Sequence, residues 1–463
     1  MENKAGLRGS MLVLFIVILV LAISILHYEA APHIPILIGA MIVTIYGFMI
    51  GYKWDYMEKA MVNGIAQGIA PILILSLIGT LIGVWVLNGT VQTITYFGLQ
   101  LLSPATFLVS TVVITAIVAT MVGSSLSAMG TIGVSLMGVA YGMDVSPAMA
   151  AGAIVSGAIF GDKLSPLSDT TNLAAATAKT NIFEHIRHML WTTIPALVIT
   201  LLIFGGIGFA TAQGTADTSQ IEEMMQVLQA EFTISVVTLV SPLLIIGLAV
   251  ARVKPIPSLA LGLIVAALTT FVTAPGSTLG DIMAAAHSGF TAETGFEAID
   301  ELLSLGGLED MLFGISLIII ALAFGGIIQG IGITEALIGG LQRVLKSRGN
   351  TIASTLASCL GVNIATGEQY LSLILPGQMY EEAYRRHNLH PKNLSRTIED
   401  GGTILHPLVP WGVIGAFVMT TLNVGMDYVF FVFLSLVTPF IALFYAYTGW
   451  TLTKRDEQED SGE

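Results

Sequence analysis

The chain is dominated by long apolar runs that recur from one end to the other. Nine of them approach or exceed the ~20 residues that cross a hydrocarbon core as a helix; they are residues 10–26, 34–50, 70–88, 105–122, 189–212, 232–250, 256–273, 311–333 and 427–448. Helices satisfy their own backbone hydrogen bonds in lipid, and the runs lack the alternation of a transmembrane β-barrel. The sequence therefore predicts an all-α polytopic membrane protein.

The composition excludes several function classes. Charged residues make up 11% of the chain, against about 25% in soluble domains. There is no basic patch for nucleic acid, no phosphate-binding glycine loop and no nucleophile elbow. The one cysteine, Cys359, has no partner for a disulfide or a metal site. The sequence therefore indicates neither an enzyme nor an ATP-driven pump. It predicts no cofactor, and an ion gradient as the energy source.

The basic residues predict the orientation in the inner (plasma) membrane. We thread the segments alternately from a cytoplasmic N-terminus. This places all 18 Lys and Arg residues except Lys163 on the inside, as the positive-inside rule expects. The arrangement requires fourteen segments, some of them re-entrant hairpins, and leaves both termini cytoplasmic.

The chain divides into two related halves. SPLSDTTNLAAA (165–176) faces HPLVPWGVIGAF (406–417) at an offset of about 240, and weaker matches occur in the same order. An odd number of segments per half would invert the second half, as in many transporters. We therefore expect a first inverted transmembrane repeat over 8–212 and a second over 231–453. An external linker over 213–230 joins them, and an acidic cytoplasmic tail covers 454–463.

The most informative stretch is SGAIFGDKLSPLSDTTNLAAA, residues 156–176. Pro166 lacks an amide hydrogen and disfavours helix at the residue before it, so we expect the helix to break near 161–168. A break at membrane depth must be buried in protein or line a wet cavity. The stretch supplies oxygen ligands suited to sodium: Asp162, Ser165, Ser168, Asp169, Thr170 and Asn172.

The charges in this stretch have different interpretations. Asp162 and Lys163 form either a structural ion pair that holds the broken helix or a functional pair. Asp169 has no charged neighbour in sequence, and proton and sodium could compete for its carboxylate, so it is the better carrier. We take Asp169, Ser168 and Asn172 as the first candidates for sodium ligands. The hydroxyls that follow Asp169 could instead cap the next half-helix.

A second break is expected in SCLGVNIATGEQYLSLILPG, residues 358–377, which contains Gly361, Gly367 and Pro376. Its polar residues are Asn363, Thr366, Glu368 and Gln369. Glu368 is the carboxylate within this apolar stretch. It either carries the ion or proton, or pairs with Lys163 across the repeat interface.

A third break is expected in SRTIEDGGTILHPLVPW, residues 395–411. Here Glu399 is expected to pair with Arg396 near the interface, whereas Asp400 is expected to lie deeper. His406 is expected to be a hydrogen-bonded structural histidine.

The first and third motifs together resemble the NhaC family of sodium/proton antiporters, which includes a malate/lactate exchanger. The resemblance covers nearly the whole chain by length, topology and both motifs. It implies export of Na⁺ in exchange for H⁺ by alternating access. It also implies that the polar residues of the first motif form the cation site. It leaves open lithium as a surrogate ion, a small organic anion or amino acid moved with the ion, and a homodimer. A different class, an ion channel or a scaffold subunit, is the remaining rival.

Overall fold

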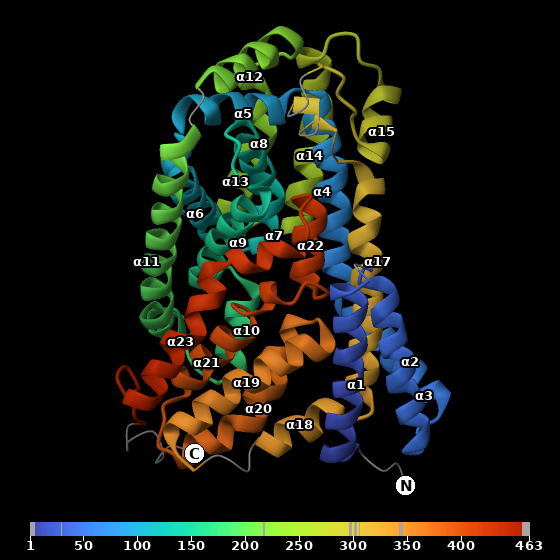
Figure 1. Ribbon diagram of the computed structural model, residues 1–463, viewed down its shortest axis with the longest axis vertical. Coiled ribbons are helices and arrows are strands. Elements are labelled where there is room, and N and C mark those ends of the chain that lie inside the picture. The colour runs from blue at the N-terminus through green and yellow to red at the C-terminus, as the bar shows by residue number, and fades with distance from the viewer. Residues whose placement is uncertain are drawn as a thin grey trace.

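The computed structural model describes residues 5–28, 30–215, 218–295, 299–300, 303–304, 306–341 and 346–455, so most of the expected tail 454–463 lies outside it. The described residues form helices and no β-strand (Figure 1). The helices of the first half are α1 (Leu7–Leu26), α2 (His33–Met49), α3 (Trp54–Gln67), α4 (Ile69–Leu87), α5 (Thr90–Leu101), α6 (Pro104–Val122), α7 (Ser125–Ala128), a π-helix (Met129–Gly133), α8 (Val134–Gly142), α9 (Pro147–Leu164), α10 (Asp169–Thr177) and α11 (Ile182–Thr215).

Helix α12 (Thr218–Glu231) connects the halves and covers most of the expected linker. The helices that follow it are a 3-10 turn (Val236–Leu239), α13 (Val240–Val250), α14 (Pro255–Thr273), α15 (Leu279–Ser288), α17 (Gly307–Gly330), α18 (Ile333–Leu341), α19 (Arg348–Thr366), α20 (Gln369–Arg386), α21 (Pro391–Gly402), a 3-10 turn (His406–Leu408), α22 (Val413–Thr421), a 3-10 turn (Met426–Phe431) and α23 (Phe433–Thr448).

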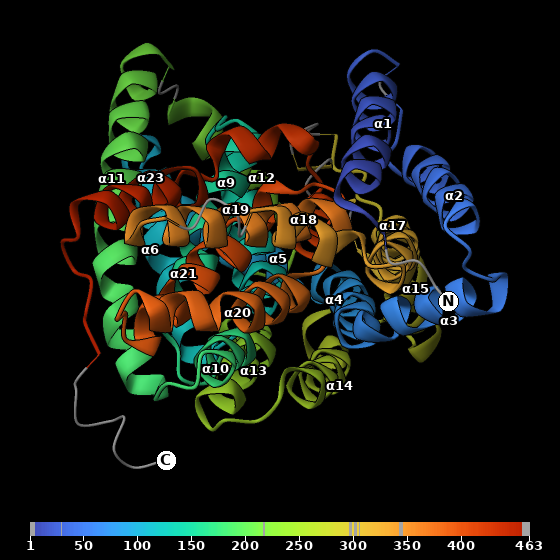
Figure 2. The same cartoon turned by 90° about the horizontal axis from the view of Figure 1, so that it is seen from below.

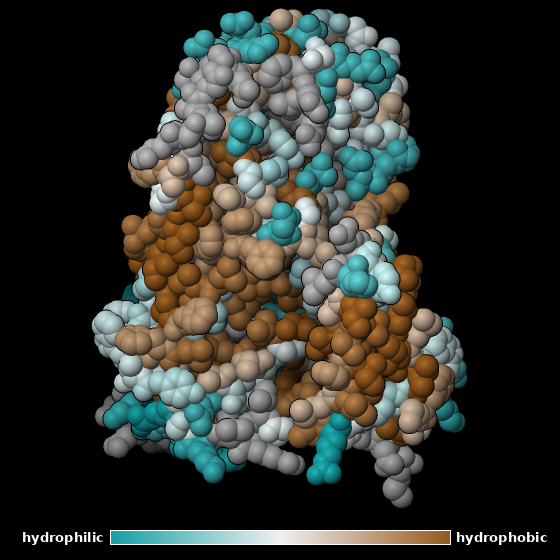
Figure 3. Space-filling view, viewed as in Figure 1, coloured by the Kyte–Doolittle hydropathy of each residue, from teal (hydrophilic) through white to brown (hydrophobic). Residues whose placement is uncertain are grey.

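Apolar helices make this a multi-pass membrane protein. Within the described residues, eight helices are long and apolar enough to cross a membrane, or nine if segments 221–231 and 236–250, bent by 92°, form one span. Two further apolar helices, α2 and α23, are shorter. On the face shown in Figure 3, hydrophobic residues cover much of the middle and lower parts of the molecule, and hydrophilic residues gather at its two ends. The predicted fold class, an all-α polytopic membrane protein, is confirmed.

Helices in the two halves correspond at a constant offset of 244 residues. Helices α6 and α19 both contain 19 residues and begin at positions 104 and 348. Helices α10 and α22 both contain 9 residues and begin at positions 169 and 413. Contacts correspond as well, since Gly157 lies against Val112 and Thr115, whereas Gly401 lies against Leu356 and Cys359. The offset of about 240 taken from the sequence is therefore four residues short.

The corresponding elements α5 and α18 lie near opposite ends of the molecule, α5 at the top and α18 at the bottom of Figure 1. The start of α1 and the end of α23 lie at the same end as α18. Helix α17 packs on α2, α3 and α4, and α4 packs on α14 and α15. Helices α6, α9, α10, α11, α19, α20, α21 and α23 form a second group beside them (Figure 2), and α22 packs on α17 and α4. The polar breaks lie in this second group.

Candidate functional site

The first polar break separates α9 from α10, where the sequence places it. Ser165 adopts extended backbone with φ −88° and ψ 125°, because a residue before proline avoids the helical region. Helix α10 restarts after Ser168, whose Oγ accepts a hydrogen bond from the Thr171 amide at 3.4 Å. Ser168 therefore acts as the N-cap, a role that satisfies one of the free amides at the start of the helix.

Lys163, next to the end of α9, is the centre of a buried charged triad formed by Asp162, Lys163 and Glu399. Its Nζ lies 3.3 Å from Asp162 Oδ2 and 3.2 Å from Glu399 Oε1. The exposed fractions of the three side chains are 7%, 1% and 0%. The expected pair of Asp162 with Lys163 is present. Glu399 comes from α21 in the other half, so the triad joins the two halves of the chain.

Hydroxyl groups surround the triad. Ser125 Oγ donates to Asp162 Oδ2 at 3.0 Å, and Lys163 Nζ donates to Thr170 Oγ1 at 2.5 Å. The other carboxylate oxygens, Asp162 Oδ1 and Glu399 Oε2, are buried without a hydrogen-bond partner among the described residues. When all three groups are ionised, two carboxylates surround one ammonium, and the triad has one surplus negative charge.

A cavity of about 700 Å³ reaches the triad from one side. Asp162 and Asp169 both line it, as do Ser124 and Ser125. The cavity extends to the loop between α13 and α14, where Arg252 and Lys254 line it. The structure thus brings the two aspartates of the first motif to one cavity. Glu399 is not among the described residues that line this cavity.

Asp169 connects the first break to the second. The Tyr370 hydroxyl donates to Asp169 Oδ2 at 2.5 Å, and Tyr370 lies in the first turn of α20. Gln369 and Tyr370 also line the cavity. Unlike the triad, Asp169 is exposed. A cation in the cavity would therefore meet Asp169 in a hydrated setting before it reaches buried Asp162.

The second break covers fewer residues than the sequence suggests. Helix α19 ends at Gly367, which has a positive φ of 67°, whereas Gly361 and Pro376 lie inside helices. Glu368 caps α20, because its Oε2 accepts from the Leu371 amide at 2.9 Å. The alternative that Glu368 pairs with Lys163 is wrong, since Glu399 takes that place.

The remaining candidates form hydrogen bonds with backbone groups. Asn363 Nδ2 donates to the carbonyls of Gly401 and Gly402 at 3.3 and 2.6 Å, and Thr366 Oγ1 donates to Val362 O. Asn172 Nδ2 donates to the carbonyls of the loop before α10, at 2.9 and 2.6 Å. Ser165 Oγ accepts from the Leu167 amide at 3.3 Å. Each of these residues tightens a break, and none of them joins the triad.

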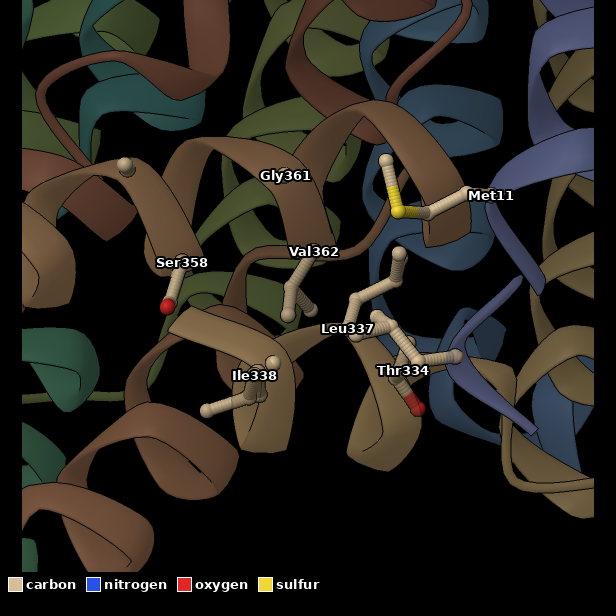
Figure 4. Close-up of a pocket in the computed structure, with 10 residues that line it drawn as sticks. Met11, Thr334, Leu337, Ile338, Ser358, Gly361 and Val362 are labelled. Atoms are coloured by element: carbon tan, nitrogen blue, oxygen red, sulfur yellow. The ribbon is translucent and has the colours of Figure 1, made fainter. Parts of the chain in front are cut away.

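A second cavity, of about 400 Å³, differs in chemistry from the first (Figure 4). It lies between α1, α18 and α19, and its lining includes Met11, Leu337, Ile338 and Val362. None of the described residues that line it is charged. Nowhere in the described part of the chain do three His, Cys, Asp or Glu side chains gather as a resident metal site. The cavity at the triad is therefore the better candidate for an ion pathway.

Comparison with known proteins gives the family. The model of the Na⁺/H⁺ antiporter family matches residues 5–171 and 157–450. The chain belongs to this family. It is 44% identical over 97% of its length to the Na⁺/H⁺ antiporter NhaC of Alkalihalophilus pseudofirmus, covering 97% of that protein. It is 42% identical to NhaC of Bacillus subtilis, over 93% of this chain and 95% of that protein. The resemblance to the NhaC family is confirmed.

A more distant relative has an organic substrate in its name. The malate-2H⁺/Na⁺-lactate antiporter of Bacillus subtilis is 34% identical, over 94% of this chain and 95% of that protein. The relatives are antiporters by name, which agrees with a transporter rather than an enzyme.

In this antiporter chain, Glu399 is the residue that the sequence assigned wrongly. It was expected to pair with Arg396, three positions earlier. Arg396 instead donates to Thr451 Oγ1 at 3.0 Å and lies over the Tyr445 ring. Residues three positions apart on a helix are neighbours, which favoured the local pair. Glu399 points instead to Lys163 of α9, a contact created by the packing of α21 beside α10 and α11.

Proposed function

We propose that this protein is a secondary Na⁺/H⁺ antiporter of the plasma membrane, which exports Na⁺ in exchange for H⁺. The charged triad is the observation that carries the proposal. Isolated charges are costly in a membrane protein interior and persist where they are paired or functional. A surplus negative charge in such a place favours the uptake of one monovalent cation. Either Na⁺ or H⁺ supplies that charge.

The same charge balance makes the two ions exclude each other. With Na⁺ beside Asp162, the triad and the ion sum to zero charge. With a proton on one carboxylate, the sum is again zero, and adding Na⁺ would leave a buried positive charge. Burial of an uncompensated charge is unfavourable by several kcal/mol. Exclusion of one ion by the other is the requirement for exchange.

The cavity supplies the route for sodium. We infer that Asp169 attracts the hydrated ion and that Asp162, with Ser124 and Ser125, replaces part of its water shell with oxygen ligands. Ser168 and Thr170 complete the polar wall at the break. The basic loop that contains Arg252 belongs to the side that the distribution of Lys and Arg predicts to be cytoplasmic. On this assignment the cavity faces the cytoplasm, where Na⁺ is collected for export.

The repeated helices supply the means of alternating access. We propose that residues 8–212 and 231–453 act as inverted repeats, supported by the offset of 244 residues and by the opposite positions of α5 and α18. Exchange of conformation between two such halves would close the cavity on one side and open its counterpart on the other. Both termini would then be cytoplasmic.

A second candidate function is exchange of an organic acid together with Na⁺ and H⁺. The cavity volume of about 700 Å³ exceeds what a bare ion needs, and Arg252 with Lys254 would attract a carboxylate. The malate/lactate relative is 34% identical. The two functions differ in whether the ion moves without an organic solute.

Purified protein in liposomes with an internal pH-sensitive dye tests the proposal. A Na⁺ gradient alone is expected to move protons, and Li⁺ and K⁺ test cation selectivity. Asp162→Asn is expected to abolish the response, whereas Asp144→Asn, outside the site, is the matched control. A response that requires malate or lactate would favour the organic-acid exchanger. A conductance without coupled proton movement would favour a channel.

A further inference from the structure

Helices α11 and α21 enclose a second set of buried polar side chains beside the triad. His185 Nδ1 and Ser395 Oγ lie 2.9 Å apart, and Thr192 Oγ1 donates to Asp400 Oδ1 at 3.0 Å. Helix α21 begins beside the segment that follows α23, where the amide of His390 donates to the carbonyl of Thr453 at 3.0 Å.

Four polar atoms in this interface have no hydrogen-bond partner among the described residues. They are the Nε2 atoms of His185 and His188, Oδ2 of Asp400 and Oε2 of Glu399. The residues are 0%, 5%, 0% and 0% exposed. Buried polar atoms of this kind are normally satisfied by internal water. Proton paths through proteins usually consist of titratable side chains joined by water molecules.

The histidines and Glu399 lie at increasing depth from the start of α21. Glu399 lies one helical turn beyond Ser395, the contact of His185, and one turn of helix rises about 5.4 Å. His188 lies near Lys392 and Asn393, at the start of α21. Lys392 is half-buried, whereas the residues from Asn393 to Gly402 are buried. A route from the end of the molecule to the triad therefore passes the two histidines first and Glu399 last.

We propose that the exchanged proton travels between the cytoplasm and Glu399 through the α11–α21 interface, separately from the sodium cavity. The inference rests on the proposed antiport. Sodium would reach the triad on the Asp162 side, and the proton would reach it on the Glu399 side. Each histidine takes a proton on its free nitrogen and releases one from the other nitrogen, with water between the groups. Its net charge is then unchanged but its tautomer is reversed, and return of a proton to the first nitrogen or rotation of the ring restores it for the next transfer. Lys163 then couples the two routes, since it contacts both carboxylates.

The charged and titratable groups around this path come from six helices. They are His185 and His188 on α11, Lys392, Arg396, Glu399 and Asp400 on α21, Asp162 and Lys163 on α9, Cys359 on α19, Tyr384 on α20 and Tyr445 on α23. The cationic side chains lie at both ends of this path, with Lys392 near the start of α21 and Lys163 beside Glu399. A proton on either histidine is therefore repelled from two sides, which favours passage over retention.

The experiment compares two transport modes of the full-length protein in liposomes. Sodium self-exchange, followed with labelled Na⁺ at equal pH on both sides, needs the cavity but no proton. Na⁺-driven proton movement, followed with the internal dye, needs both routes. The test variants are His185→Gln, His188→Gln and the double variant. His287→Gln is the control, because His287 is exposed and far along the chain on α15.

We expect the double variant to keep sodium self-exchange within about twofold of the wild-type rate. Its proton-coupled exchange should fall about tenfold or more, as when a proton-transfer group is removed from an enzyme. Equal loss of both modes would mean that the histidines only support the fold, and it would overturn the inference. Unchanged proton coupling would overturn it as well. If the wild-type protein itself moves no protons with Na⁺, the proposed antiport fails instead.

Discussion

Removal of one charge from the triad gives the sharpest test of the site. Glu399→Gln keeps the shape of the side chain, and the Gln carbonyl can still accept from Lys163. The substitution removes the surplus negative charge, so Asp162 and Lys163 would balance each other without sodium. We therefore expect the protein to fold and to bind Na⁺ more weakly.

The distances within the triad set the size of the expected loss of sodium affinity. Lys163 Nζ lies 3.3 Å from one carboxylate and 3.2 Å from the other, so the two acidic oxygens are at most about 6.5 Å apart. A unit charge removed about 6.5 Å from a sodium ion held by Asp162 changes its energy by about 2.5 kcal/mol at an effective dielectric constant of ~20. This loss corresponds to a decrease in sodium affinity on the order of 70-fold.

The assay is the Na⁺ concentration that gives half-maximal sodium self-exchange in liposomes at equal pH on both sides, because Glu399→Gln also removes the carboxylate proposed to take the proton. Glu381→Gln is the matched control, because Glu381 forms an exposed pair with Lys179 at 2.7 Å, with exposed fractions of 44% and 70%. Exposed pairs contribute about 0–1 kcal/mol, so this variant should behave as wild type. A half-maximal concentration for Glu399→Gln within about twofold of wild type would refute the charge argument, since the Coulomb term predicts a far larger shift.

Three further predictions concern the fold and the cavity. Asp169→Asn should raise the half-maximal Na⁺ concentration, because the exposed carboxylate of the cavity is lost; unchanged exchange would remove Asp169 from the pathway. Lys163→Ala should reduce the yield of folded protein on size exclusion, since breaking a buried pair costs about 3–5 kcal/mol, and a normal yield would contradict this. Gly123→Ala should lower the melting temperature more than Gly367→Ala. Both glycines have a positive φ, a conformation that costs a residue with a Cβ about 1–2 kcal/mol. Only at Gly123 would the new Cβ also meet a side-chain carbon at 2.5 Å. An equal decrease would contradict the packing argument.

The helices and the first break could be predicted from the sequence, because both depend on local chemistry. Apolar runs long enough to cross a membrane occur as helices. Pro166 ends α9 by restricting the residue before it, a constraint that acts within two residues. The neighbours Asp162 and Lys163 were expected to pair for the same local reason, and their charged groups lie 3.3 Å apart.

The third member of the triad could not be predicted in this way. Glu399 and Lys163 are 236 positions apart, and their contact depends on how α21 packs beside α10 and α11. The sequence offered Arg396 as a nearer partner for Glu399 and offered Glu368 as a partner for Lys163. Both alternatives satisfy local charge balance, so only the packing of the two halves decides between them. Glu368 caps α20 instead, because an acidic residue before a helix accepts its free amides.

The position of Lys163 suggests why the ion site lies where the halves meet. A carboxylate pair within one half would bind a cation equally well in every arrangement of the two halves, and binding would then favour no conformation. In the triad, one carboxylate belongs to α9 and the other to α21, so a shift between these helices changes the charge that surrounds Lys163. A ligand can favour one conformation only by the difference in its affinity for the two. Because Na⁺ and H⁺ both act on this shared charge, the binding of either ion would be linked to the packing of α9 against α21.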